Sequence, residues 1–144
     1  MGPSGSGKST LMNVVAGLDD ITSGEIWVDG NPIGSLDDEA RTVLRRKHIG
    51  FIFQSFNLIP TLTAQENIHL PFVLAGVRLD AQTRYWIAHL VRSLGLDERL
   101  DHLPSELSGG QQQRVAIVRA LLSRPDVVFA DEPTGNLDSN SGAE

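Results

Sequence analysis

The first ten residues constrain the fold of this chain more than any other stretch. Residues 2–9, Gly-Pro-Ser-Gly-Ser-Gly-Lys-Ser, fit the phosphate-binding loop pattern G-x-x-x-x-G-K-[ST] without a mismatch. Glycines without a Cβ let the backbone take positive φ and close around an anion with its N–H groups. Lys8 can reach the β- and γ-phosphates of a nucleotide, and the Ser9 hydroxyl can ligate Mg²⁺. The alternative is a Gly/Ser-rich tail at a frayed terminus.

The residues after this loop favour the phosphate site. Four apolar residues recur at helical spacing: Leu11, Val14, Val15 and Leu18. Gly17 is placed to end that helix. A helix that begins at Lys8 or Ser9 would add its free N–H groups and its positive dipole end to the loop. Such a loop should follow a β-strand, whereas only Met1 precedes it here.

Composition and charge exclude several classes of protein. The chain has 144 residues, which suits one domain or a piece of one. Its formal charge of -6 argues against a nucleic-acid partner, and the basic cluster at residues 45–48 is typical of a solvated helix end. There is no cysteine, which excludes disulfides and fits the cytosol. No apolar run approaches the roughly 20 residues of a membrane span, so any membrane association requires a partner.

Residues 23–53 are expected to alternate between strands and a helix. A β-favouring run with Asp29-Gly30 predicts a hairpin, with Pro32 on an edge strand and Trp27 packed against the sheet. We expect Ser35 to cap a helix that runs to about residue 47. Its apolar face would consist of Leu36, Ala40, Val43 and Leu44. The apolar run at residues 49–53 predicts a buried strand.

Residues 63–95 read as all-helical and predict a helical subdomain. Thr63 and Glu66 form a capping box that opens a helix near residues 64–75, which Pro71 would kink or interrupt. Asp80 can cap a second helix that ends at Gly95. Its buried stripe would comprise Ile87, Leu90, Val91 and Leu94.

A second helix N-terminus is prepared for an anion near residue 108. Ser108 suits the N-cap, and Gly109 and Gly110 leave backbone N–H groups accessible before Gln111. Three apolar residues lie at helical spacing behind them: Val115, Val118 and Leu122. An ordinary capped helix after a turn explains the same residues equally well.

Polar residues follow the two apolar strands. Residues 127–130 predict a buried strand that delivers Asp131 and Glu132 at its end, and Gln54 follows the strand at residues 49–53. In open α/β sheets, ligands gather at the carboxyl ends of strands. Asp131 could hold Mg²⁺ there, directly or through water, and Glu132 could orient or deprotonate an attacking water. The alternatives are a solvated turn for the acidic pair and a loop-capping amide for Gln54.

Five motifs in this order resemble an ABC-type ATPase. Residues 2–10 resemble the Walker A loop, residues 53–55 (Phe-Gln-Ser) the Q-loop, and residues 107–111 (Leu-Ser-Gly-Gly-Gln) the family signature. Residues 127–132 resemble Walker B, and residues 135–138 (Gly-Asn-Leu-Asp) the D-loop. The sequence that flanks these motifs is similar to that of the macrolide- and lipoprotein-export branch. It is also similar to the cell-division ATPase of the same branch.

This resemblance implies a fold and a division of the chain. The fold would be that of an α/β P-loop NTPase, with a RecA-like parallel sheet core and an inserted helical subdomain. Residues 1–54 and 107–144 would form the core with its edge hairpin, and residues from about 55 to 106 the helical subdomain. The surface from about 54 to 105, including Glu98 and Arg99, would face a transmembrane permease. The protein would then be cytoplasmic, held at the inner face of the membrane by that permease.

The resemblance also implies roles for individual residues. The phosphates of ATP would be bound by Gly2, Pro3, Ser4, Gly5, Ser6, Gly7, Lys8, Ser9 and Thr10. Ser9 and Gln54 would hold Mg²⁺ with help from Asp131, and Glu132 would be the general base. Ser108, Gly109, Gly110 and Gln111 would contact the γ-phosphate of ATP in a second copy or a paired ABC subunit, which makes the active unit a head-to-tail dimer. Asp138 would communicate between the two sites.

The chain departs from the family pattern at both ends. The strands before Walker A and their adenine-stacking aromatic are missing, and Tyr85 lies in the wrong segment to replace it. No histidine follows residues 135–138 to act as the switch. We therefore expect a fragment, incomplete at both termini, of an ATPase domain of roughly 220–250 residues.

Three hypotheses follow. The first is an ATPase that drives export or extraction by a permease. The second is a soluble ABC-type ATPase of DNA repair, chromosome organisation or translation, which the negative charge and the lack of sustained heptads between residues 54 and 108 disfavour. The third is that the 144 residues alone are non-catalytic.

Overall fold

A computed structural model of the chain describes residues 7–130 and has the expected α/β fold. Its helices are α1 (Lys8–Val15), α2 (Asp38–His48), α3 (Ala64–Ala75), α4 (Ala81–Ser93) and α5 (Gly109–Leu121). Its strands are β1 (Trp27–Val28), β2 (Asn31–Pro32), β3 (Ile49–Ile52) and β4 (Val127–Ala130). Short 3₁₀ turns occupy Ile33–Ser35, Asp97–Arg99 and Pro104–Glu106.

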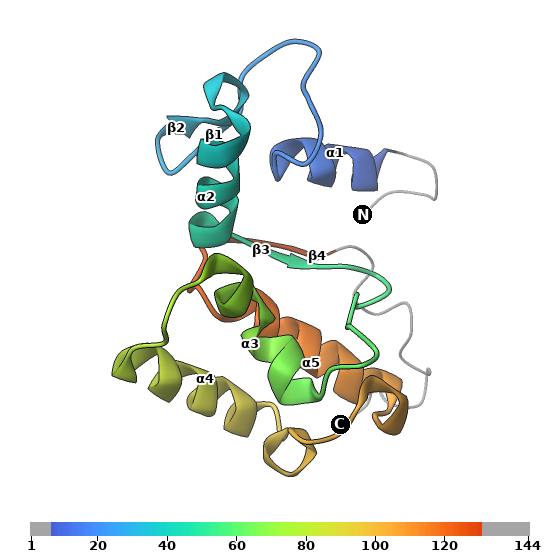
Figure 1. Ribbon diagram of the computed structural model, residues 1–144. Coiled ribbons are helices and arrows are strands. Elements are labelled where there is room, and N and C mark those ends of the chain that lie inside the picture. The colour runs from blue at the N-terminus through green and yellow to red at the C-terminus, as the bar shows by residue number, and fades with distance from the viewer. Residues whose placement is uncertain (1–6, 131–144) are drawn as a thin grey trace.

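The parallel pair β3–β4 divides the molecule. Ile49 pairs with Val127, and Ile52 pairs with Ala130. Helices α3, α4 and α5 lie on one side of this pair, whereas α1, α2 and the β1–β2 hairpin lie on the other (Figure 1). The two strands therefore end side by side, as expected of a parallel sheet with a ligand site at its carboxyl edge.

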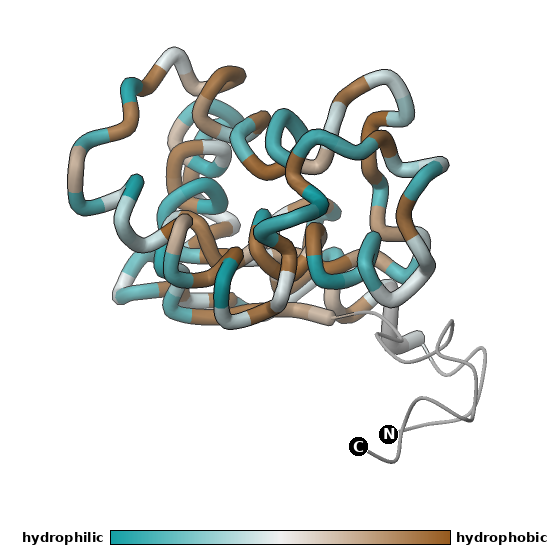
Figure 2. Tube along the Cα trace, turned by 90° about the horizontal axis from the view of Figure 1, so that it is seen from below, coloured by the Kyte–Doolittle hydropathy of each residue, from teal (hydrophilic) through white to brown (hydrophobic). Residues whose placement is uncertain are grey.

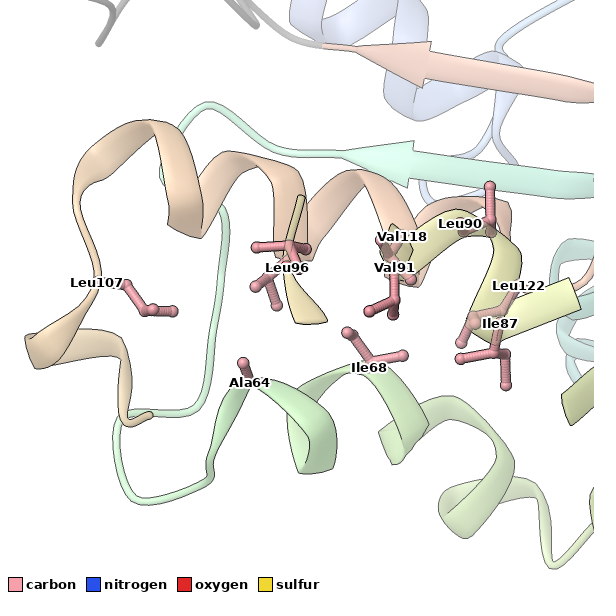
Figure 3. Close-up of a cluster of buried hydrophobic side chains, with 10 residues drawn as sticks. Ala64, Ile68, Ile87, Leu90, Val91, Leu96, Leu107, Val118 and Leu122 are labelled. Atoms are coloured by element: carbon pink, nitrogen blue, oxygen red, sulfur yellow. The ribbon is translucent and has the colours of Figure 1, made fainter. Parts of the chain in front are cut away.

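The main hydrophobic core lies between α3, α4 and α5. Figure 3 shows Ala64 and Ile68 of α3 facing Ile87 and Val91 of α4. The predicted stripes of α4 and α5 are confirmed, with Leu94 only partly buried at the margin. The most deeply buried large side chains of this core are Ile68, Leu96, Val115 and Val118. Because α5 supplies part of this core, the helical segment is packed directly onto the helix that begins at Ser108.

Local capping signals fold as predicted. Thr63 and Glu66 form a reciprocal capping box, and the Thr63 Oγ1 accepts from the Glu66 backbone N–H at 3.2 Å. The Asp80 carboxylate accepts from the Thr83 N–H at 2.7 Å. Gly95 follows α4 with a φ of 62°. We expected Pro71 to kink or interrupt this helix; α3 continues through Pro71 to Ala75, so Pro71 does not interrupt it.

The β1–β2 hairpin is also confirmed, with one correction. Its turn residues Asp29 and Gly30 both have positive φ, 47° and 72°, as a type I′ turn requires. The prediction that Trp27 packs against the sheet is wrong, because its side chain is 57% exposed and its indole N–H donates to Glu25. A two-residue strand pair leaves too little sheet face to cover an indole.

Ser35 does not cap α2. It lies in the preceding 3₁₀ turn, where its hydroxyl donates to the Pro32 carbonyl. The cap is Asp37, whose carboxylate accepts from the Ala40 N–H at 2.8 Å. Extended backbone at Leu36 separates the two turns, so the chain enters the helix two residues later than we predicted.

Two segments expected to be buried are not. Val127 and Val128 of β4 are 40% and 39% exposed, because β3 is the only strand that pairs with β4 within residues 7–130. Leu11 and Leu18, on the predicted apolar side of α1, are 64% and 48% exposed.

Short apolar and polar stretches alternate along the trace (Figure 2), and no helix in the described part of the chain could cross a membrane.

Candidate functional site

The first helix opens on a glycine whose backbone is left-handed. Gly7 is the N-cap of α1 with φ 80° and ψ 13°, and no side chain caps the first turn. A Cβ at Gly7 would meet nothing within 4 Å, so the conformation rather than crowding favours glycine here. Lys8 and Ser9 form the first helical residues and Thr10 is exposed. The helix thus begins where the phosphate-loop pattern requires, with an N-terminus suited to an anion.

Part of the predicted site lies outside the described residues. This applies to Gly2, Pro3, Ser4, Gly5 and Ser6 of the loop and to Asp131, Glu132 and Asp138.

The second helix N-terminus, at α5, has a complete capping box. The Ser108 hydroxyl accepts from the Gln111 N–H at 3.2 Å, and the Gln111 side chain accepts from the Ser108 N–H at 2.8 Å. Ser108 and Gly109 are exposed, and a Cβ at Gly110 would meet nothing within 4 Å. Buried Leu107 anchors the chain just before the cap. The backbone here is open to a large anion or a partner surface, although the capping box alone also fits an ordinary helix start.

Gln54 lies where β3 ends. The register pairs Ile52 with Ala130, so both strands end at the same edge. Gln54 is exposed and begins a turn over residues 54–57. The structure therefore brings Gln54 to the edge from which the chain continues to Asp131, as the sequence predicts.

The turn after Gln54 is held by a residue that the sequence reasoning missed. Arg119 of α5 donates to the carbonyl oxygens of Asn57, at 2.8 Å, and of Phe56. Burial lowers the pKa of the Arg119 guanidinium from its usual value. An arginine in a polar helix repeat carries no sequence signal for this contact, since its partners lie more than sixty residues earlier.

Asn67 was missed as well. Its side chain is fully buried in α3, and its Oδ1 accepts from the Ile59 N–H at 2.7 Å. Its Nδ2 donates to the carbonyl oxygens of Ile59, Leu62 and Thr63. Asn67 thereby fixes the loop between the Gln54 turn and α3. The buried amide inside an otherwise apolar helical repeat was the signal available in the sequence.

The opposite ends of the strands carry a cluster of one histidine and two carboxylates. The His48 Nδ1 lies 2.6 Å from an Asp126 carboxylate oxygen and 3.7 Å from Asp29. Of the predicted solvated helix end at residues 45–48, Arg46 and Lys47 are exposed, whereas Arg45 is partly buried and donates to the Gly17 carbonyl. Within residues 7–130, no group of three or more His, Asp or Glu side chains is arranged to hold a metal ion.

A cavity of about 580 Å³ opens between α2, β3 and the ends of α3 and α5. Phe51, Phe72 and Val77 provide apolar walls, and Arg46 and Arg124 provide positive charge. Val73, Leu74 and Tyr85, on α3 and α4, are more than 70% exposed. Such exposed apolar side chains are typical of a surface that contacts another molecule.

The ABC transporter family model matches residues 1–135. The uncharacterized ABC transporter ATP-binding protein YbbA of Escherichia coli (strain K12) is 58% identical over 142 residues, covering 99% of this chain and 62% of YbbA. The macrolide export ATP-binding/permease protein MacB of Brucella melitensis is 53% identical over 144 residues, covering the whole chain and 22% of MacB.

Solved structures of an ABC cassette also match this chain. The dimeric structure of MJ0796, a bacterial ABC transporter cassette, superposes with a TM-score of 0.84 at 47% identity, covering 99% of this chain and 62% of that one. A second dimeric structure, of MJ0796 in a post-hydrolysis state bound to ADP and Pi, has a TM-score of 0.83, also at 47% identity. The chain thus spans 62% of the length of YbbA and of MJ0796. The resemblance carried by the five motifs is confirmed: the chain belongs to the ABC transporter family.

Proposed function

We propose that this protein binds and hydrolyses ATP as the nucleotide-binding subunit of an ABC transporter, powering export or extraction by a membrane permease. The observation that carries the proposal is the start of α1 on left-handed Gly7, which lies inside a complete phosphate-loop sequence. The parallel register of β3 and β4 supports it, because Gln54 and the chain leading to Asp131 emerge at one edge.

The phosphates of ATP would lie in the loop of residues 2–10, with Lys8 against the β- and γ-phosphates. Ser9, Gln54 and Asp131 offer a hydroxyl, an amide and a carboxylate oxygen, a donor set that fits Mg²⁺. When bound, Mg²⁺ would neutralise charge that develops on the phosphate oxygens. Glu132 would accept a proton from the water that attacks the γ-phosphorus, while the bond to the β–γ bridging oxygen breaks.

The functional unit would be a head-to-tail dimer. Exposed Ser108 and Gly109, with Gly110 and Gln111, would contact the γ-phosphate held by the loop of a second copy or a paired ABC subunit. Asp138 would communicate between the two sites. The dimeric structures of MJ0796 support a dimer as the functional unit.

We propose that the permease contacts the helical subdomain, residues 55–106, and holds the protein at the cytoplasmic face of the membrane. The cavity beside Phe51 and the exposed Val73 and Leu74 support this surface. MacB, an ATP-binding/permease protein, shows that a relative of this chain joins both functions in one polypeptide. Nucleic acid is not a proposed partner, given the charge of -6.

Glu132→Gln in the intact protein tests the proposed chemistry. The amide keeps the size of the side chain but cannot accept the proton, so ATP hydrolysis should fall at least about a hundredfold. ATP binding should stay within about twofold, since Glu132 has no role in holding the phosphates. Steady-state phosphate release and equilibrium nucleotide titration measure the two quantities. Wild-type turnover in this variant would remove Glu132 from the role of general base.

A soluble ABC-type ATPase is the second candidate function. The exposed apolar side chains on α3 and α4 fit a permease or another protein partner. Purification from detergent-solubilised membranes decides between the two. Co-purification of a permease supports the transport role, and recovery of the protein without any membrane protein supports the soluble role.

A further inference from the structure

Arg119 joins α5 to the turn that carries Gln54. Its Nη1 donates to the Asn57 carbonyl at 2.8 Å, and its Nη2 donates to the carbonyl of Phe56. One planar guanidinium thereby holds two consecutive backbone carbonyls. Hydrogen bonds from a charged donor are stronger than neutral ones, and the fork geometry fixes their direction.

The turn adopts a backbone that requires such a partner. Phe56 and Asn57 both have positive φ, 59° and 47°. Positive φ is rare for residues other than glycine and is unfavourable for a bulky residue such as phenylalanine. Strained backbone of this kind persists only where the surrounding structure determines it. The Phe56 side chain is buried, and its N–H donates to the Phe53 carbonyl at 2.9 Å, so the turn is closed locally and anchored by Arg119.

Helix α5 is rigidly held at the Arg119 end. The Trp86 Nε1 of α4 donates to the Leu121 carbonyl at 3.0 Å. Gly50 of β3 approaches α5 so closely that a Cβ there would lie 2.5 Å from the Ala120 carbonyl oxygen. Val115 and Val118 are fully buried between these contacts and the helix N-terminus. A displacement at Ser108 is therefore carried along about 16 Å of helix, eleven residues, to Arg119.

We propose that Arg119 is a positioning residue that sets the place of Gln54 together with that of the α5 N-terminus. The proposal rests on the proposed function, in which Gln54 serves the subunit's own ATP and Ser108 contacts the ATP of the partner. Arg119 then links the two ATP sites of a dimer through a single helix. In this arrangement, the placement of Gln54 in one site depends on the helix that supplies Ser108 to the other.

Arg119→Gln and Arg119→Lys in the intact protein test this link. The glutamine removes the charged fork, so hydrogen exchange at the amides of residues 54–57 should accelerate about tenfold or more. The kcat for ATP hydrolysis should fall about tenfold while KM stays within about twofold, since misplacement of a reacting group affects turnover more than binding. Lysine, which keeps the charge without the fork, should give an intermediate loss.

Trp86→Phe is the matched control. It removes one hydrogen bond from a side chain to a backbone carbonyl at the same end of α5 but does not touch the Gln54 turn. Its kcat should stay within about twofold of the wild type even where its melting temperature falls as far as that of Arg119→Gln. An equal loss of kcat in the two variants would overturn the proposal. So would unchanged exchange at residues 54–57, or wild-type kcat, in Arg119→Gln.

Glu132→Gln separates the two levels of inference. One possible result is that the wild type and Arg119→Gln both hydrolyse ATP at the same rate whereas Glu132→Gln does not. In that case the positioning role is wrong and the proposed function stands. If the wild-type protein does not hydrolyse ATP, the proposed function is wrong and the role of Arg119 falls with it.

Discussion

At the scale of single residues, Gly50 shows how closely α5 approaches the sheet. A Cβ at this position would lie 2.5 Å from the Ala120 carbonyl oxygen and 3.1 Å from the Pro125 ring. Gly50→Ala must therefore push helix and strand apart, and we expect a loss of about 1–3 kcal/mol in the free energy of unfolding. Denaturant unfolding of the intact protein measures the loss.

Gly34→Ala is the control for Gly50→Ala. Its added Cβ would come within 3.3 Å only of the flexible end of the Ile21 side chain. This variant should lose less than about 0.5 kcal/mol, as surface substitutions usually do. Equal stability of the two variants would show that the contact between Gly50 and α5 is loose.

Residues whose partners are close in sequence were predictable, and the others were not. The caps at Thr63, Asp80 and Ser108 follow from side chains that bond three residues away. The roles of Asn67 and Arg119 depend on where a distant or irregular loop comes to lie. A single sequence shows the donors of such side chains but not which carbonyls will face them.

At the scale of elements, the start of α4 depends on one carboxylate. The hydrogen bond from the Thr83 backbone N–H to the Asp80 carboxylate lowers the pKa of Asp80 below its usual value. A carboxyl group with a depressed pKa in the folded state stabilises the fold above its unfolded pKa, about 3.9. That contribution is lost as the pH falls through the lower, folded value.

Asp80→Ala should therefore lower the melting temperature at pH 7. The difference from the wild type should shrink as the pH falls below about 4, and it should vanish once the pH has passed the lower, folded pKa of Asp80, where the wild-type carboxylate is protonated. Asp80→Asn is the control, since it keeps a capping side chain but has no charge to titrate. At every pH, the melting temperature of Asp80→Asn should differ less from that of the wild type than the melting temperature of Asp80→Ala does. A difference between Asp80→Ala and the wild type that does not vary with pH would contradict the carboxylate as its source.

Elements were predicted better than their burial. Helices α3, α4 and α5 begin at the expected caps, and β3 and β4 occupy the expected apolar runs. The prediction of burial failed at β4 and α1. An apolar pattern shows which side chains of a segment favour burial, but it does not show which other segment packs over them. Val127 and Leu11 keep the apolar pattern of buried elements yet remain exposed within residues 7–130. The carboxyl edge of the sheet was still predictable, since parallel pairing follows from the order of the motifs.

At the scale of the whole molecule, the two helix N-termini serve different ATP molecules if the dimer is head-to-tail. Each composite site would then combine the phosphate loop of one subunit with Ser108 and its neighbours from the other. Lys8→Ala inactivates the first part, and Gly110→Asp places a negative charge against the phosphate in the second. Each variant alone should be inactive, because both of its composite sites are damaged.

Mixing the two variants should restore hydrolysis. A mixed dimer contains one site built from an intact loop and an intact signature, so an equal mixture should recover up to about a quarter of the wild-type rate if subunits exchange freely and the sites act independently. Phosphate release from the mixture, compared with each variant alone, gives the result, and differently tagged subunits report how much mixed dimer is present. Mixed dimers that bind no more ATP in a closed, stable form than either variant alone would show that each subunit completes its own site.

The same experiment with Arg119→Gln added to the subunit that carries intact Lys8 places a loosened Gln54 turn in the restored site. Hydrolysis should fall there. When Arg119→Gln is placed in the other subunit instead, the Gln54 turn of the restored site keeps its arginine. Hydrolysis should then remain unchanged only if α5 of that other subunit holds its N-terminus without Arg119.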